Sequence, residues 1–179
     1  MDEKKRFEVA FQCRNMEIDL FWKRSSFYCV FVGAALVAYY TARTEMAYFG
    51  LMIASFGLVA SFAWLLGSIG SKWWIENWER KVEESAPAVV GDLFSVSDEH
   101  LKRNFGVSPI RFSVTRLAIL LSAFGVVLWV VIFMSELFRH FGSSRWWPAV
   151  AIAAGAIIFV ILFFACARGG NRTKAGKQP

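Results

Sequence analysis

Residues that build metal sites, disulfides and catalytic centres are scarce in this chain. Its 179 residues include only three cysteines and two histidines, and charged residues make up only 19%. No C-x-x-C pair or cysteine–histidine cluster occurs, and Asp98, Glu99 and His100, as consecutive residues of a helix, would point in different directions. Phosphate-binding glycine loops, H-E-x-x-H and nucleophile motifs are also missing. We therefore expect no enzyme activity, no metal site and no cofactor.

Apolar residues dominate the chain instead, at 56%, with 17% aromatic residues. A helix that crosses about 30 Å of hydrocarbon needs roughly 20 mostly apolar residues. Four runs meet this condition. The residues outside them, about half of the chain, are divided mainly between an N-terminal arm, one middle segment and a short tail, which leave no room for an ordinary soluble domain. The runs are Ser25 to Ala42, Met46 to Gly70, Leu117 to Leu137 and Trp147 to Ala167. The sequence predicts an all-α integral membrane protein with four transmembrane helices in two hairpins.

The basic residues predict the orientation. Of the 20 Lys and Arg residues, 17 lie in the N-terminal arm, the middle segment and the tail, and three lie in the two hairpin turns. Basic residues in short loops stay in the cytoplasm, so both termini and the middle segment are expected there. The chain then divides into a cytoplasmic amphipathic helix (1–24), a first hairpin (25–70), cytoplasmic linker helices (71–116), a second hairpin (117–167) and a basic tail (168–179).

The N-terminal arm has the pattern of a helix with two apolar faces. Its polar stripe is Glu8, Gln12, Asn15, Asp19 and Lys23. One apolar arc holds Phe7, Phe11, Ile18 and Trp22, and the other holds Val9, Cys13, Met16 and Leu20. Two arcs require two sets of packing partners. They either cover the middle segment of the same chain or contact another subunit, with Phe11 and Ile18 as candidate contact residues.

The middle segment begins as an extension of the second span. Trp74 and Trp78 belong to an apolar stripe, while oppositely charged residues four apart cover the outer surface, and the helix is expected to end near Pro87. The two indoles either anchor the helix at the lipid headgroups or form a contact in an oligomer. Ser108 and Pro109 have the pattern of a helix start, so the third span is expected to begin there.

A pore built from several chains would need lining groups, a gate and a ligand site. The hydroxyls within the spans either line such a pore or bond within their own helices: Tyr39, Tyr40, Thr41, Ser55, Ser61, Ser122 and Ser135. An apolar gate would use Phe56 or Phe62. An anionic ligand would be bound by basic residues without a helix neighbour of opposite charge, and the candidates are Lys102, Arg103, Arg111, Arg14 and Arg24.

Two stretches resemble small bacterial membrane proteins of conflict and antiphage systems. F-W-K-R-S-S-F-Y (21–28) leads into the first span, and G-S-K-W-W-I-E-N-W-E-R (70–80) closes the first hairpin. The layout is similar to SLATT-type effectors, the membrane partner of Hailong-type systems and RipA-like octameric membrane proteins. It covers roughly residues 5 to 85 and rests on pattern, and a second hairpin is a departure from the two-span SLATT type. The resemblance implies an oligomeric, membrane-perturbing effector in a bacterial inner membrane, controlled by a nucleotide or nucleic-acid signal.

Two functions follow from these features. The first is an oligomeric pore or channel-like effector of four or more chains, gated by an anionic nucleotide or short oligonucleotide in antiphage defence. The second is a non-conducting membrane scaffold or assembly factor that binds a cytoplasmic partner, such as the product of a neighbouring gene. In both, the lipid bilayer and further copies of the chain are partners.

Overall fold

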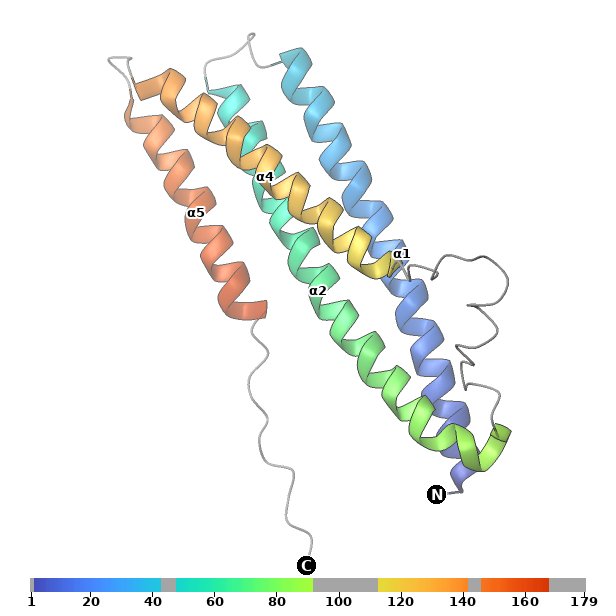
Figure 1. The fold of residues 1–179 in the computed structure, drawn as a ribbon. Helices are drawn as coiled ribbons and strands as arrows, with labels where there is room; N and C mark the ends of the chain where they lie inside the picture. Colours follow the sequence, from blue (N-terminus) through green and yellow to red (C-terminus); the bar gives the residue numbers. More distant parts are fainter. Residues whose placement is uncertain (1, 43–47, 92–112, 142–145, 168–179) are drawn as a thin grey trace, which may run out of the picture.

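The computed structural model describes residues 2–42, 48–91, 113–141 and 146–167, and in these residues it is helical. The helices are α1 (Glu3–Ala42), α2 (Phe49–Val90), α4 (Val114–Phe141) and α5 (Trp147–Ala167) (Figure 1). Each contains a segment long and apolar enough to cross a membrane. The predicted all-α membrane architecture with four spanning helices is therefore confirmed.

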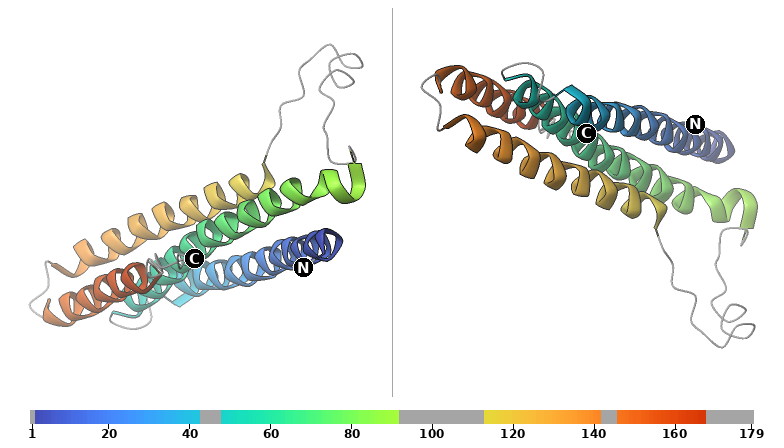
Figure 2. Two further views of the ribbon diagram at one scale, coloured as in Figure 1. Left: turned by 90° about the horizontal axis from the view of Figure 1, so that it is seen from below. Right: turned by 90° about the horizontal axis from the view of Figure 1, so that it is seen from above.

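The helix α2 is the centre of the bundle. It packs against α1, α4 and α5, and the two further views place it between α1 and α4 (Figure 2). The helices α1 and α2 have 40 and 42 residues and project beyond the other two at one end (Figure 1). We call this the charged end, because it holds most of the charged residues of α1 and α2, and we call the opposite end of the bundle the turn end.

Two groups of side chains fill the interior. The larger group lies among all four helices and is centred on Leu51, Ala54 and Trp129, which are fully buried. The smaller one lies towards the charged end, where Phe21 of α1, Ile75 of α2 and Ala118 of α4 meet. Lipid tails are as apolar as these side chains, so the hydrophobic effect does not drive the helices together within the membrane. Close packing of this kind holds membrane helices together instead.

The helices run without a break across residues 24 and 70, where the sequence suggested boundaries between domains. The first transmembrane run is thus the second half of one long helix, and the Trp-rich stretch continues the second span. At about 1.5 Å per residue, α1 is roughly 60 Å long. This is about twice the thickness of the bilayer core, so a large part of α1 and α2 lies outside it.

One predicted helix end was wrong, and another falls outside the described residues. The helix α2 does not stop near Pro87 but continues to Val90, with the proline inside it. A proline removes one backbone hydrogen bond and bends a helix without always ending it, and the last turn of α2 is deflected in Figure 1. The helix α4 begins at Val114, where the backbone N–H of Arg116 donates to the Ser113 hydroxyl. Ser113 is therefore the N-cap, whereas Ser108 and Pro109 lie outside the described residues.

Candidate functional site

The exposed face of α1 carries one stripe along its whole length. Towards the charged end it is polar, with Gln12, Asn15, Asp19 and Lys23 all exposed. At 100° per residue the same stripe continues through the apolar half of the helix. There it consists of small or β-branched residues that are also exposed: Ser26, Val30, Gly33, Ala34, Val37 and Thr41. We call the four polar and the six small or β-branched residues together the α1 stripe.

The outward faces of α4 and α5 differ from the α1 stripe. Large apolar side chains cover them, with Leu120, Phe124, Ile161 and Leu162 each more than half exposed. Such side chains are suited to contact with lipid. At Gly33, by contrast, an added Cβ would meet no neighbouring atom of the described residues within 4 Å. The α1 stripe therefore leaves room for another helix or a solute to approach α1 closely.

The hydroxyls considered as pore lining fall into two groups. Ser61 and Ser122 are fully buried inside the bundle, and the Tyr39 hydroxyl donates to a carboxylate there. Tyr40, Thr41 and Ser135 are exposed. The Thr41 hydroxyl donates to the carbonyl of Val37 at 2.9 Å, so it is satisfied by its own helix, as is that of Ser55.

The two candidate gate residues do not share a face of α2. Phe56 is 55% exposed and lies in an apolar groove with Phe31 and Ala34 of α1, at the edge of the α1 stripe. Phe62 is partly buried. Six positions along a helix place two side chains about 120° apart, so the structure does not bring this pair together, and only Phe56 adjoins the stripe.

Of the two apolar arcs of the N-terminal arm, one is largely used within the chain. Ile18 packs against the cluster of Phe21, Ile75 and Ala118, and Phe11 is half-buried with its ring 6.0 Å from that of Phe7. The second arc stays open: Val9, Met16 and Leu20 are 42%, 54% and 38% exposed. It continues along α1 as Phe27 and Phe31, which are also exposed. We call these five residues the open arc of α1.

The tryptophans after the second span lie at the surface of α2. Trp73 and Trp74 are exposed, and their rings contact edge to face at 4.8 Å. Trp78 is half-buried and has the Lys81 ammonium 4.2 Å above its ring. Trp74 and Trp78 therefore remain available for either of the roles that the sequence suggested.

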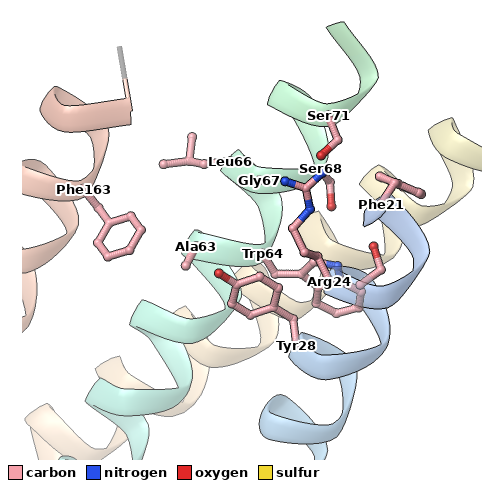
Figure 3. Close-up of a pocket in the computed structure, with 11 residues that line it drawn as sticks. Phe21, Arg24, Tyr28, Ala63, Trp64, Leu66, Gly67, Ser68, Ser71 and Phe163 are labelled. Carbon is pink, nitrogen blue, oxygen red and sulfur yellow. The ribbon is translucent and has the colours of Figure 1, made fainter. Parts of the chain in front are cut away.

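The basic residues proposed to bind an anion differ in their surroundings. Arg14 pairs with Glu79 of α2 at 3.5 Å, a partner that the sequence did not reveal because the two lie on different helices. Lys102, Arg103 and Arg111 lie outside the described residues. Arg24 lies at a pocket of about 300 Å³ between α1, α2 and α5, which Figure 3 shows.

The walls of the Arg24 pocket are polar on one side and apolar on the other. Hydroxyls line it from Ser25 and Tyr28 of α1 and from Ser68 and Ser71 of α2. Ala63, Leu66 and Phe163 form the apolar part, with Phe163 directed in from α5 (Figure 3). Two buried polar atoms of lining residues, Ser68 Oγ and Trp64 Nε1, have no hydrogen-bond partner among the described residues.

A buried carboxylate at the turn end was missed in the sequence. An acid near the end of a span usually reaches water, but only 2% of Glu136 is exposed. Its Oε1 accepts hydrogen bonds from the Tyr39 hydroxyl at 2.7 Å and from Arg139 at 3.2 Å, and its Oε2 lies 4.0 Å from His140 Nε2. The spacing of Glu136, Arg139 and His140 on one helix face could have indicated a cluster. The contribution of Tyr39 from α1 could not be read from the sequence.

The sequence model of the octameric membrane protein family (8xMP) matches residues 4–138. The chain belongs to this family. The match contains α1, α2 and α4 as far as Phe138, including the α1 stripe, the open arc and Glu136, whereas α5 lies beyond it. No curated protein and no solved structure matches the chain.

Membership in 8xMP confirms that the protein is an oligomeric membrane protein, as expected from the resemblance to RipA-like octameric proteins. Self-association and the lipid bilayer as partners are likewise confirmed. The likeness to SLATT-type and Hailong-type proteins, the inner membrane as the location and the cytoplasmic position of the termini stay predictions.

Proposed function

We propose that eight copies of this chain form a poorly selective pore in the bacterial inner membrane, with the α1 stripe facing the centre. The single observation that supports this arrangement is the composition of the stripe. It passes from polar residues such as Asp19 and Lys23 to Ser26, Gly33 and Thr41, while large apolar side chains are exposed on α4 and α5. A water-filled path needs small or polar walls, and lipid needs an apolar surface.

The geometry of a ring sets the width of such a pore. Eight helices packed about 10 Å apart place their axes about 13 Å from the centre. Subtracting a helix radius of about 5 Å leaves an opening about 16 Å across. Hydrated ions and small solutes pass an opening of this size, which is why we propose low selectivity. The neighbouring chain would then lie on the open arc, beside the stripe, and Phe56 at its edge is the better placed of the two candidate gate residues.

The proposed regulator is an anionic nucleotide or short oligonucleotide, as in an antiphage effector. Arg14 is a weak candidate for binding it, because Glu79 already neutralises its charge. Arg24 is also paired, with Glu17 at 3.4 Å, and it adjoins the apolar half of α1. The proposed surface for the soluble ligand therefore consists of Lys102, Arg103 and Arg111. Charge neutralisation at these residues would make binding weaker as salt rises.

Cysteine accessibility in proteoliposomes tests the pore. In a variant whose native cysteines are changed to Ser, Val30→Cys and Val37→Cys should react with a charged methanethiosulfonate reagent, and the reaction should alter ion flux. The matched controls are Leu120→Cys and Ile157→Cys, which are 65% and 50% exposed on α4 and α5 and should stay unreactive because they face lipid. Flux that is absent under every ligand and voltage, or stripe cysteines as unreactive as the controls, would rule the pore out.

A non-conducting scaffold is the second candidate function. The exposed pair Trp73 and Trp74 favours it, because an aromatic patch just beyond a span suits a protein partner as well as headgroups. Changing both residues to Ser should remove such a partner from the purified complex and leave the oligomer intact. Retention of the partner by the double variant would argue against this contact.

A further inference from the structure

We propose that the Arg24 pocket binds the phosphate group of a membrane phospholipid. The ligand chemistry is a phosphate ester, and the bilayer is its source. The inference is independent of ion conduction, because a pore and a scaffold could each hold a lipid at this place.

The polar side of the pocket is rich in hydrogen-bond donors. Arg24 donates from Nε to the Leu20 carbonyl at 3.1 Å and from one terminal nitrogen to Glu17 at 3.4 Å. A guanidinium has five N–H donors, so several remain for a ligand. Figure 3 shows the side chain of Arg24 extending towards Ser68, which lines the same pocket.

Ser68, in the same wall of the pocket, has a hydroxyl left unsatisfied by the described residues. It is only 3% exposed, and its hydroxyl has no partner in the described part of the chain. Leaving a buried polar group unpaired costs about 1–3 kcal/mol. A phosphate oxygen in the pocket would satisfy this hydroxyl and accept from Arg24 in a charge-assisted hydrogen bond. The indole N–H of Trp64, buried and unpartnered in the same wall, is a further donor.

The position of the pocket along the helices favours a lipid over a soluble anion. Arg24 is the last charged residue before the apolar half of α1, and Lys72 is the first after the apolar part of α2. The pocket therefore lies at the level of the headgroups. Its apolar wall, formed by Ala63, Leu66 and Phe163, would contact the beginning of an acyl chain. A free phosphate or nucleotide would leave that wall unused.

One group opposes the binding of an anion. The Glu17 carboxylate lies 3.4 Å from Arg24, and only 19% of its side chain is exposed. This distance is long for a charge-assisted hydrogen bond, which typically measures 2.7–2.9 Å. Arg24 is therefore not held tightly by Glu17 and can turn part of its donor set to the ligand.

Thermal-shift titration of the full-length oligomer in detergent tests the assignment. Dioleoylphosphatidylglycerol should stabilise the protein, and dioleoylglycerol, which has the same chains without the phosphate, should not. Arg24→Gln should weaken the binding of the phospholipid at least about tenfold, because a hydrogen bond to a charged group contributes about 1.5–3 kcal/mol. The matched control is Lys23→Gln, which removes the neighbouring charge from the exposed stripe and should bind as the unmodified protein does.

Ser68→Ala provides a second variant that does not remove a charge. Without lipid it should be as stable as the unmodified protein or slightly more so, since it removes an unpaired buried hydroxyl. With the lipid it should gain less stability. Equal losses in Lys23→Gln and Arg24→Gln would overturn the proposal, because they would show general attraction to surface charge. Stabilisation by inorganic phosphate or AMP through Arg24, with none by the phospholipid, would also overturn it and assign the pocket to a soluble anion.

Discussion

The indole of Trp129 on α4 lies directly over Gly57 of α2. A Cβ at residue 57 would overlap the ring atoms of Trp129, which is fully buried and cannot move aside. The absence of a side chain at Gly57 thus allows α2 and α4 to approach closely at the centre of the bundle. Small residues have this role in many contacts between membrane helices.

Gly57→Ala should therefore destabilise the protein. Alanine favours a helix by up to about 1 kcal/mol over glycine, but forced overpacking typically costs about 1–3 kcal/mol. The matched control is Gly155→Ala in α5, where an added Cβ meets no neighbouring atom of the described residues within 4 Å, so the variant should be as stable as the original or up to about 1 kcal/mol more stable. Thermal unfolding of the two variants in the same detergent measures the difference. Equal melting temperatures would mean that Trp129 does not cover Gly57.

The hydrogen bond from Tyr39 to Glu136 should contribute to the stability of the bundle. Tyr39→Phe removes one of the hydrogen-bond donors to the buried Glu136 carboxylate, and we expect a loss of about 1–3 kcal/mol in stability. Tyr40→Phe, at a neighbouring residue that is 79% exposed, should change stability by only a few tenths of a kcal/mol. Chemical denaturation in mixed micelles compares the two. A loss that is no larger for Tyr39→Phe than for Tyr40→Phe would contradict the contact.

Assembly should depend on the open arc of α1. Changing Val9, Met16 and Leu20 together to Ser should produce smaller species in native mass spectrometry while each chain stays folded, because these side chains pack on little within the chain. Ile18→Ser should instead lower the stability of the chain itself, since Ile18 packs on Phe21 and Ile75.

The control for assembly is Gln12→Ser on the polar stripe, which should leave the oligomer unchanged. If the triple variant keeps its stoichiometry, subunits meet elsewhere, and the exposed tryptophans of α2 become the next surface to test.

The pH dependence of Glu76 provides a further test. Its hydrogen bond from Lys72, at 2.8 Å, is the largest cause that holds its pKa below the ordinary 4.5, and the nearby charges of Arg116 and Arg80 act in the same direction. A lowered pKa in the folded chain means stability that is present at neutral pH and is lost as the pH falls through the folded pKa. Because the carboxylate is about half exposed, the contribution should stay below about 1 kcal/mol.

Glu76→Gln should accordingly be slightly less stable than the original at pH 7, and the gap should close as the medium is acidified below pH 4.5. Glu83→Gln, an exposed change on the same helix, is the comparison and should show a smaller gap. A gap that widens on acidification would reverse the sign and refute the assignment.

The sequence predicted the elements better than it predicted their contacts. Length and hydropathy were enough for four spans, and the periodicity around Lys72 and Glu76 predicted a pair that the structure contains. Contacts such as Arg14 with Glu79 depend on the register of α1 against α2, which no local pattern encodes.

The sequence also did not predict where α2 ends or that Glu136 is buried, and both have physical reasons. Pro87 was expected to stop α2, but one lost hydrogen bond so close to the end of a long helix does not prevent another turn. Glu136 looked like a surface residue because an acid near the end of a span usually reaches water. Its burial follows from Tyr39, which is distant in sequence and adjacent only after folding.

The unbroken length of α1 has a mechanical consequence. The helix contains no proline and a single glycine, Gly33, between its first residue, Glu3, and its last, Ala42. It therefore has no joint at the membrane surface, where a flexible linker would separate an outer segment from a spanning one. A twist or tilt imposed near Ala10 reaches Tyr39 as the same motion of one rigid rod. Whatever binds the outer half acts directly on the half that crosses the bilayer.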